Sequence, residues 1–315
     1  MAHILQHKKV NNNNMNFLTF QKKFPTEQAV ISHFITIRYK GNPACHHCGN
    51  CTVYQKADRP KVFDCPACKN TFSIFKDTIF ENSPTDLRIW MYAIHLFLNG
   101  KKGISGLQLM RETGVTYKTA WRILKQIRLA MNNNSFHEAF EAIVEVDETY
   151  VGGKPRKRNK GRNDKGETPN KRGRGTSKTP VVGLIDRQKK QVYAKVAFPN
   201  KEGKKLTGKQ LLAIISEVSK ETATFMTDEF RSYNILSRSG YIHLVVDHTK
   251  SFADGNIHTN GIESFWATLK RGVYGIYHSI SIKYLQNYVN EFCFRYNNRN
   301  NDGMFDLLLT QTIKN

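Results

Sequence analysis

The sequence predicts a multidomain α/β protein in which two small N-terminal modules precede a larger domain built on a mixed β-sheet. Four cysteines form two closely spaced pairs, the segment after them has helical periodicity, and short β-rich runs then alternate with helical runs. With 315 residues, 39% of them hydrophobic, the chain can form more than one core. The predicted segments are 1–40 (a polar lead with a short helix), 41–80 (a cysteine-rich module), 84–135 (a helical module) and 140–315 (the mixed-sheet domain).

The charge of the chain indicates a polyanionic partner. There are 48 Lys and Arg against 26 Asp and Glu, a net charge of +22, and neutralising phosphates releases their counterions. A basic surface can also serve solubility alone, but the size of the excess and its concentration in one segment favour a nucleic acid. Because no run approaches the ~20 apolar residues of a membrane span and the start lacks the pattern of a signal peptide, we expect a cytoplasmic protein, nucleoid-associated if the cell is bacterial.

The cysteine spacing predicts a zinc ribbon. Cys45 and Cys48 are followed after sixteen residues by Cys65 and Cys68. Two such CxxC knuckles suit four thiolates around one structural zinc ion. A thioredoxin-like role for one pair is the alternative, and the second pair and the lack of a βαβ pattern disfavour it. The other nearby candidates, His46, His47 and Cys51, lack the paired spacing. Cys293 is expected to be a small buried hydrophobic residue of a C-terminal helix.

The helical module predicts a helix-turn-helix. One apolar helix is expected over 87–98, and Ser105 with Gln108 then forms a capping box before a second helix, with Gly114 at the turn into a third. In that third helix an apolar face would pack on the core: Ala120, Ile123, Leu124 and Ile127. The opposite face would enter a major groove of DNA: Tyr117, Lys118, Arg122 and Lys125. An ordinary helical hairpin with a solvated basic face is the alternative.

A basic segment follows within the mixed-sheet domain. Residues 154–178 contain eleven Lys and Arg against two acidic residues and no periodic apolar positions, which predicts a flexible loop. A localisation signal or a solubilising run is the alternative. Because the loop closely follows Asp147, we expect it to hold a DNA backbone beside that residue. The expected contacts include Arg156, Lys157, Arg158, Arg172 and Arg174.

Three acidic residues far apart in the chain carry the candidate chemistry. Asp147 and Asp228 are predicted where the β-rich runs Ala-Ile-Val-Glu-Val-Asp and Thr-Phe-Met-Thr-Asp end, and Glu263 lies near the start of a helix. Carboxylates mounted on strand ends and a helix suit hard divalent cations, which bind oxygen ligands and activate water for phosphoryl transfer.

The helix around Glu263 separates two faces. An apolar stripe is predicted to face the core: Ile262, Phe265, Trp266 and Leu269. Asn260, Glu263 and Lys270 recur on another face. Glu263 and Lys270 are seven positions apart, which is too far for a routine ion pair within a helix. We therefore expect Lys270 to contact a DNA phosphate.

The remaining periodicity completes a mixed α/β sheet. Besides the strand that carries Asp147, strands are expected over 180–185, 192–198, 222–227 and 243–246, and helices over 208–219, 261–271 and 282–297.

The paired cysteines, the helix-turn-helix and the segments around the three acidic residues together resemble the zinc-ribbon insertion-sequence transposases of the DDE class. The resemblance runs from about residue 26 to the C-terminus and is most specific in Val-Asp-Glu-Thr-Tyr-Val-Gly-Gly and in residues 258–272. It implies an RNase H-like catalytic domain with Asp147 on the first strand, Asp228 on the fourth and Glu263 on a late helix.

The resemblance also implies an activity and partners. The activity is that of a DNA transposase that binds terminal inverted repeats and catalyses strand cleavage and strand transfer. Its cofactors would be two Mg²⁺ or Mn²⁺ ions at the carboxylates and one structural Zn²⁺ at the cysteines. Its partner would be double-stranded DNA, at the transposon ends and at the target, and joining two ends implies a homo-oligomer on that DNA.

Alternatives remain open at the site and for the function. Asp247 also ends an apolar strand, but the implied sheet order puts the fourth strand, not the fifth, beside the first. Asn260 is an alternative third ligand, and Glu148 and Glu229 should point to the opposite face of the sheet. The rival functions are a non-catalytic DNA-binding regulator and a structure-selective nuclease on the same fold.

Overall fold

The computed structural model describes residues 15–131, 139–152, 178–198, 206–246 and 258–313, and the statements below refer to these ranges. The chain forms two compact units. The first comprises Met1–Met131 and Asn300–Asn315, and the second comprises Asn132–Arg299. Within the described ranges, none of the helices has the length and apolar character needed to span a bilayer.

The first unit contains the cysteine-rich module and a set of helices. Its three short strands form an antiparallel sheet in the order β1-β2-β3. Its elements are α1 (Phe17–Lys23), α2 (Glu27–Tyr39), β1 (Tyr54–Gln55), β2 (Val62–Asp64), β3 (Thr71–Ser73), α3 (Leu87–Asn99), α4 (Gly106–Thr113), α5 (Tyr117–Ala130) and α10 (Met304–Gln311). Thr26 caps α2 by accepting the N–H of Ala29, and α2 is the short helix expected within residues 1–40.

The last helix, α10, belongs to the first unit although it follows the second unit in sequence. The ring of Phe305 lies 5.8 Å from that of Phe24, and Asp306 pairs with Lys23 at 3.2 Å and with His33 at 2.9 Å. The helix α10 therefore packs with the N-terminal helices, whereas the sequence predicts it within the 140–315 segment. The contacts join residues more than 270 positions apart, which local periodicity cannot reveal.

The second unit is built on a five-stranded mixed sheet with strand order β6-β5-β4-β7-β8. β4 is antiparallel to β5 and parallel to β7, and β8 is parallel to β7. The strands are β4 (Ile143–Val151), β5 (Thr179–Asp186), β6 (Gln191–Val196), β7 (Thr224–Thr227) and β8 (Ile242–Val245). The fourth strand of this sheet thus lies beside the first, which confirms the predicted RNase H-like mixed-sheet class.

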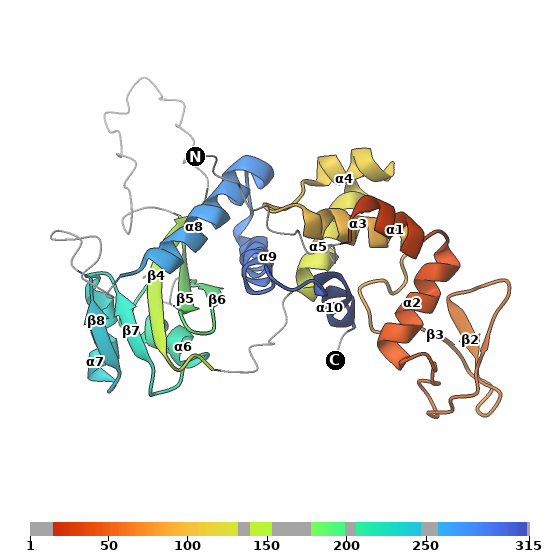
Figure 1. Cartoon of the computed structure of the whole chain (residues 1–315), viewed down its shortest axis with the longest axis horizontal. Helices are drawn as coiled ribbons and strands as arrows, with labels where there is room; N and C mark the ends of the chain where they lie inside the picture. Colours follow the sequence, from red (N-terminus) through yellow and green to blue (C-terminus); the bar gives the residue numbers. More distant parts are fainter. Residues whose placement is uncertain (1–14, 132–138, 153–177, 199–205, 247–257, 314–315) are drawn as a thin grey trace, which may run out of the picture. The chain divides into compact units, whose positions relative to one another are not determined.

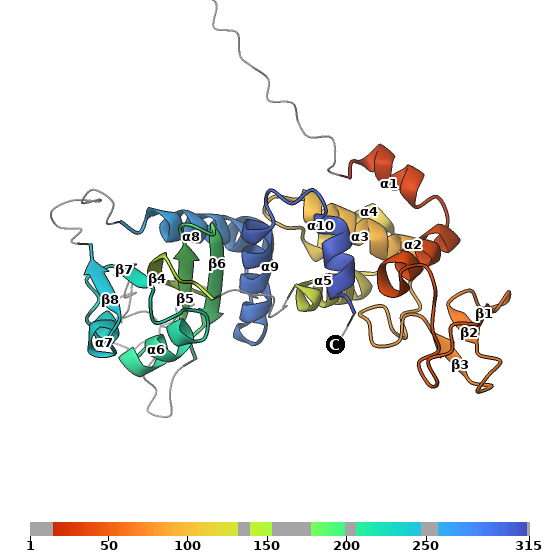
Figure 2. The ribbon, with the colours of Figure 1, turned by 60° about the horizontal axis from the view of Figure 1, so that its bottom comes forward.

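Helices cover both faces of this sheet (Figure 1). The helical elements are α6 (Gly208–Ser216), η2 (Arg231–Tyr233), α7 (Asn234–Arg238), α8 (Asn260–Gly272), the π-helix η3 (Val273–Tyr277), η4 (Ile282–Tyr284) and α9 (Leu285–Asn297). Figure 2 shows α8 along one face and α6 on the other. Strand alternation explains both cores, because Val144 and Val146 pack with Leu211 of α6 while Val151 packs with Ile262 of α8.

Two features differ from the sequence predictions. Asp147 does not end its strand, because residues 148–151 continue the antiparallel ladder to residues 179–182 of β5. Cross-strand pairing overrides the drop in hydrophobicity that suggested an end there. The short helices α1, α7 and α10 also lack predicted counterparts, since each has eight residues or fewer and too few apolar positions to show a period.

Candidate functional site

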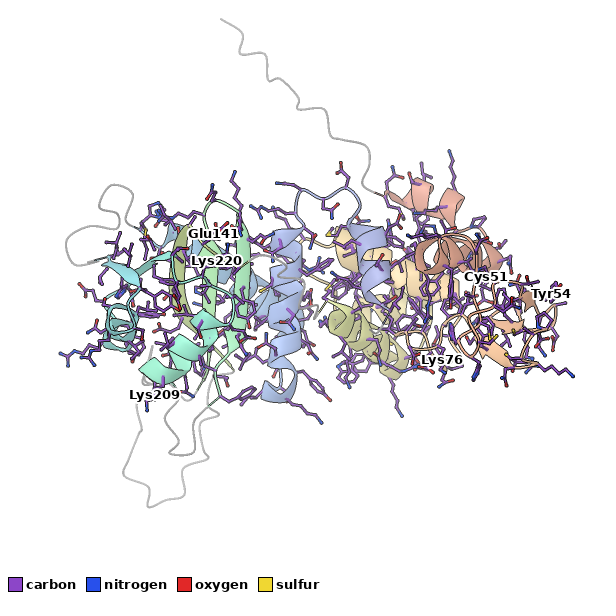
Figure 3. All side chains as sticks on the ribbon, turned by 90° about the horizontal axis from the view of Figure 1, so that it is seen from below. Cys51, Tyr54, Lys76, Glu141, Lys209 and Lys220 are labelled. Atoms are coloured by element: carbon purple, nitrogen blue, oxygen red, sulfur yellow. The ribbon has the colours of Figure 1, made fainter. Side chains whose placement is uncertain are left out.

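The register of β4 and β7 brings Asp147 and Asp228 to the same level of the sheet. Glu145 pairs with Met226 in the parallel ladder, and the same offset two residues further on aligns Asp147 with Asp228. Lys220 pairs with Glu141 near the beginning of these two strands (Figure 3). Strands of a parallel pair advance together, so the two carboxyl groups lie at one edge of the β4–β7 ladder.

The environment of Asp147 is strongly acidic. Burial, followed by the negative charges of Glu148 and Asp228, raises the pKa of Asp147 to about 7. The charge of Glu263 raises it further, and the backbone N–H of Glu148 opposes these effects. Glu263 therefore shares an electrostatic environment with the two aspartates, although it comes from a helix more than 110 residues after Asp147.

The helix α8 presents Glu263 in its first turn. Ile262, Phe265, Trp266 and Leu269 are buried, so the apolar stripe packs as predicted. Asn260, Glu263 and Lys270 are exposed, as expected for a second face of the helix. The hydroxyl of Thr259 donates to Oε1 of Glu263 at 2.9 Å and thereby holds this carboxylate near the start of the helix.

The other acidic candidates lie elsewhere. Glu148 points away from α8 and accepts a hydrogen bond of 2.9 Å from Tyr233, a buried residue of the α6 core. Glu229 is exposed. Asp228, one of the three carboxylates of the candidate site, acts on Asp147 through its charge, and its Oδ1 accepts the backbone N–H of Phe230 at 3.0 Å. Asp247 lies outside the described residues.

A polar cluster that the sequence analysis missed lies under α8. Glu145 is 1% exposed and accepts hydrogen bonds from Arg187 Nε at 2.7 Å and from the backbone N–H of Ile262 at 2.9 Å. Arg187 also donates to the carbonyl oxygen of His258 at 2.6 Å. A glutamate in the middle of the apolar run Ile-Val-Glu-Val was the available signal, because a charge inside a buried strand needs partners.

The four predicted zinc ligands converge. The sulfur atoms of Cys45, Cys48, Cys65 and Cys68 all lie within 4.8 Å of one another, and two pairs are 3.6 Å apart. A tetrahedron with Zn–S bonds of about 2.3 Å requires sulfur separations of about 3.8 Å, so the cluster could hold one zinc ion. The backbone N–H of Cys68 makes the largest contribution in lowering the pKa of Cys65 to about 6, whereas the pKa of Cys48 is raised to about 12 beside the other three thiols.

The two cysteine knuckles repeat one local geometry. The N–H of Cys45 binds the carbonyl of Asn50 and that of Cys65 binds the carbonyl of Asn70. The residue after each second cysteine, Gly49 or Lys69, has a positive φ of 73° or 57°. Cys51 is exposed and outside the convergent group (Figure 3).

Within the described ranges, the cysteines are the only group of three or more potential metal ligands that converge this closely. The carboxyl groups of Asp147, Asp228 and Glu263 do not converge as closely as the cysteines, but the charges of Asp228 and Glu263 act on Asp147. Like charges repel, so a bound cation would offset the repulsion among the three carboxylates. Their donor atoms are all carboxylate oxygens, which fit Mg²⁺ or Mn²⁺.

The helix-turn-helix has the predicted core. Ala120, Ile123, Leu124 and Ile127 of α5 are buried, and Gly114 ends α4 in the left-handed conformation with φ of 71°. On the other face Tyr117 and Lys118 are exposed, while Arg122 and Lys125 are half-buried. The ammonium group of Lys125 lies 5.6 Å from the ring centre of Trp121. The predicted basic-loop contacts lie outside the described residues: Arg156, Lys157, Arg158, Arg172 and Arg174.

The strand order of the second unit defines an RNase H-like domain. Its acidic residues lie on the first strand, just after the fourth strand and on a covering helix. In the sequence, this domain follows a four-cysteine module and a helix-turn-helix. Residues 140–297 match the model of the ISXO2-like transposase domain, and the protein belongs to this family of DDE transposases.

Two relatives are similar in sequence. The first is the "Uncharacterized protein in transposable element ISH50" of Halobacterium salinarum, which is 29% identical over 276 residues, 80% of this chain and 87% of that protein. The second is an "Uncharacterized transposase-like protein" of Haemophilus influenzae, which is 35% identical over 88 residues, 28% of this chain and 71% of that protein.

Solved structures of Mos1 transposase complexes are also similar. A pre-cleavage Mos1 transpososome is 13% identical with a TM-score of 0.27, and the match covers 71% of this chain and 79% of that chain. The Mos1 strand transfer complex is 12% identical with a TM-score of 0.30, and that match covers 70% and 73%. The fold class therefore rests on the strand order of the sheet.

Proposed function

We propose that this protein is a DNA transposase that binds the terminal inverted repeats of its element and catalyses metal-dependent strand cleavage and strand transfer. The proposal is supported chiefly by the register that aligns Asp228 with Asp147. The helix α8 adds a third carboxylate, Glu263, whose charge acts on Asp147. Three carboxylates from separate elements of one domain are poorly explained by folding alone, because their mutual repulsion destabilises the fold.

The carboxylates would form the metal site. Asp147, Asp228 and Glu263 would hold two Mg²⁺ or Mn²⁺ ions, with Asn260 beside them on α8. When bound, these ions supply charge stabilisation to the phosphoryl transition state and acidify the attacking group. A carboxyl group must be deprotonated to bind these ions. Because the pKa of Asp147 is raised to about 7, Asp147 would have to release a proton when the metal binds. Lys270, exposed on the same helix, would bind a phosphate of the DNA.

The chemistry consists of two displacements at phosphorus. In cleavage, a water oxygen attacks the phosphorus at the element end and the bond to the 3′ oxygen breaks, which leaves a 3′ hydroxyl and a 5′ phosphate. In strand transfer, this 3′ hydroxyl attacks a phosphorus of the target DNA and displaces the 3′ oxygen of the target strand. Each step breaks one phosphodiester-type bond for the bond it forms, so no covalent protein–DNA intermediate is needed.

The N-terminal modules would provide recognition. The exposed residues at the start of α5, Tyr117 and Lys118, would contact bases or backbone in a major groove. The four-cysteine module would hold one structural zinc ion and support binding of the terminal repeat. The basic loop 154–178 would hold the DNA backbone, and a homo-oligomer would bring two ends together.

A strand-transfer assay with the element ends tests the proposal. We expect Asp147→Asn, Asp228→Asn and Glu263→Gln each to abolish cleavage with Mg²⁺ while end binding stays within about twofold of wild type. Asp247→Asn, the control, should remain active. If Asp247→Asn is inactive and Asp228→Asn active, the second ligand lies after the fifth strand.

Other outcomes separate the remaining alternatives. If Glu263→Gln stays active while Asn260→Ala does not, Asn260 is the third ligand. Cleavage by the wild-type protein with no joining of ends would favour the nuclease. Tight end binding with no reaction in either metal would favour the regulator and contradict the proposal.

A further inference from the structure

Glu145 is a buried carboxylate that joins the strand of Asp147 to the helix of Glu263. It lies on β4 two residues before Asp147, on the same face of the strand. Its side chain is 2% exposed. One oxygen accepts from Arg187 and the other from the backbone of α8. A charge this deeply buried is costly unless every partner is in place, so the arrangement resists small displacements.

Glu145 replaces the usual side-chain cap of α8. The N-cap residue of this helix is Thr259, which makes no side-chain capping hydrogen bond, because its hydroxyl donates to Glu263 instead. The N–H of the third helical residue, Ile262, would normally bind the N-cap side chain. It binds Oε2 of Glu145 at 2.9 Å. The helix therefore begins at a position that β4 defines, and the negative charge also favours a helix N-terminus.

Arg187 and His258 complete the connection. Arg187 follows β5 and lies 2.7 Å from Oε1 of Glu145 through Nε. Its Nη2 lies 2.7 Å from Nδ1 and 2.6 Å from the carbonyl oxygen of His258, two residues before α8 begins. One guanidinium group thus holds both the strand residue and the segment that enters the helix, and its planar shape makes this geometry specific.

The fit between helix and strand is close. A Cβ on Gly261 would lie 2.8 Å from Oε2 of Glu145, nearer than a carbon atom can approach without displacement. Gly261 precedes Ile262, and Glu263 follows it. The carboxylate of Glu145 therefore contacts the backbone directly beside the third acidic residue.

We infer that Glu145, together with Arg187 and His258, is a positioning residue that sets the place of Glu263 relative to Asp147. This inference rests on the proposed function, because it assigns Glu263 to the same metal site. Glu145 would touch neither metal nor DNA. It would act through the start of α8, and its loss would displace one ligand without removing any.

The test compares Glu145→Gln and Glu145→Ala with wild type in the full chain. Gln keeps an oxygen acceptor for the N–H of Ile262 but loses the charge that Arg187 binds, while Ala loses both. The first readout is hydrogen exchange of the amides of residues 260–263 without metal. We expect about tenfold faster exchange at Ile262 in Glu145→Ala and a smaller change in Glu145→Gln.

The second readout is the Mn²⁺ concentration that gives half-maximal end cleavage. Loss of a group that orients a ligand typically costs 10- to 100-fold in metal affinity or activity, so this concentration should rise by about that factor in Glu145→Ala. Arg187→Lys should show an intermediate rise. End binding should stay unchanged, because the helix-turn-helix lies in the other unit.

Glu291→Gln is the matched control. Glu291 is fully buried, accepts from Tyr277 at 2.7 Å and pairs with Arg295 at 3.0 Å, so its neutralisation breaks a similar pair within the same unit. It should lower stability without changing exchange at Ile262 or the Mn²⁺ requirement. If Glu291→Gln changed the exchange at Ile262 and the Mn²⁺ requirement as much as the Glu145 variants do, Glu145 would contribute only to general stability. That result would overturn the inference.

Two further outcomes are decisive. If Glu145→Ala does not fold, Glu145→Gln and Gly261→Ala replace it, and a wild-type Mn²⁺ requirement in both would refute the inference. If the wild-type protein itself cleaves no DNA, the proposed function fails. Hydrogen exchange at Ile262, compared between Glu145→Ala and wild type, would still report whether Glu145 holds the start of α8 in place.

Discussion

Asp147 lies directly opposite Gly183 in the antiparallel ladder between β4 and β5. A Cβ on Gly183 would lie 2.5 Å from Trp266 and 2.8 Å from Ile262, both on α8. The missing side chain therefore lets the helix lie against the sheet beside Asp147. Gly183 and Glu145 act on the same helix, one by leaving space and the other by binding its first turn.

Gly183→Ala should impair activity more than folding. The added methyl group must push Trp266 and α8 outward, and overpacking of this kind costs about 1 to 3 kcal/mol. Denaturant unfolding should show this loss, and end cleavage should fall by at least about tenfold because Glu263 moves with the helix. Gly275→Ala is the control, since a Cβ there would meet nothing within 4 Å. Wild-type cleavage by Gly183→Ala would show that α8 tolerates the displacement.

Asp147→Asn should stabilise the metal-free protein at high pH. Burial, followed by neighbouring carboxylates, raises the pKa of Asp147 to about 7 from an ordinary value of 3.8. Because the folded-state pKa is the higher one, the stabilising contribution of the protonated form is fully present below pH 3.8 and is lost as the pH rises through about 7.

Near pH 8 the variant should therefore exceed wild type by about 1 to 3 kcal/mol in the free energy of unfolding, and near pH 4 the difference should shrink. Denaturant unfolding with a chelator measures both values. Glu229→Gln, at an exposed neighbouring position, should show no such dependence. A difference that stays constant with pH would mean that Asp147 is not the group that titrates.

The cysteine module should bind one zinc ion per chain. Cys65→Ser removes one of four converging sulfurs, so metal analysis should show a loss of zinc, and the module should unfold because the metal contributes to its folding. Cys51→Ser should retain the zinc, since Cys51 is exposed and outside the group. Full zinc content in Cys65→Ser would contradict the assignment.

The basic loop should contribute affinity that does not depend on DNA sequence. Neutralising Arg156, Lys157, Arg158 and Arg172 should reduce the slope of log K against log salt by up to about 3 to 4 units for specific and random DNA alike. Filter binding or fluorescence anisotropy over a salt series measures the slope. An unchanged slope would show that these charges do not contact phosphate.

The C-terminal helix should stabilise the N-terminal unit. Leu308 of α10 is fully buried, and Leu308→Ala should cost about 2 to 5 kcal/mol in that unit. Asp306→Asn removes the partner of Lys23 and His33 but should cost under about 1 kcal/mol, because the pair is half-exposed. Hydrogen exchange resolved by unit should place both effects in residues 15–131, with Asp302→Asn, at an exposed position, as the control. An equal increase of hydrogen exchange in the second unit, Asn132–Arg299, would contradict this assignment.

Much of the fold follows from local patterns. The helix α5 shows its buried and exposed faces in its periodicity, and Gly114 marks the turn before it because glycine adopts a positive φ without strain. The paired cysteines converge because their spacing matches two repeated turns. The sequence also indicated the strand that contains Asp147 and the strand that precedes Asp228, although not the continuation of β4 to Val151.

The amino-acid sequence by itself determined the family, the helix-turn-helix, the cysteine cluster and the candidate carboxylates, because these depend on residue type and short spacings. Only the tertiary structure decided that Asp228 aligns with Asp147, that Glu145 caps α8 and that α10 packs with the N-terminal helices. Each of these three relationships joins residues about 80 or more positions apart. Strand register, a buried ion pair and the packing of a terminal helix are set by the whole core, so no local period records them.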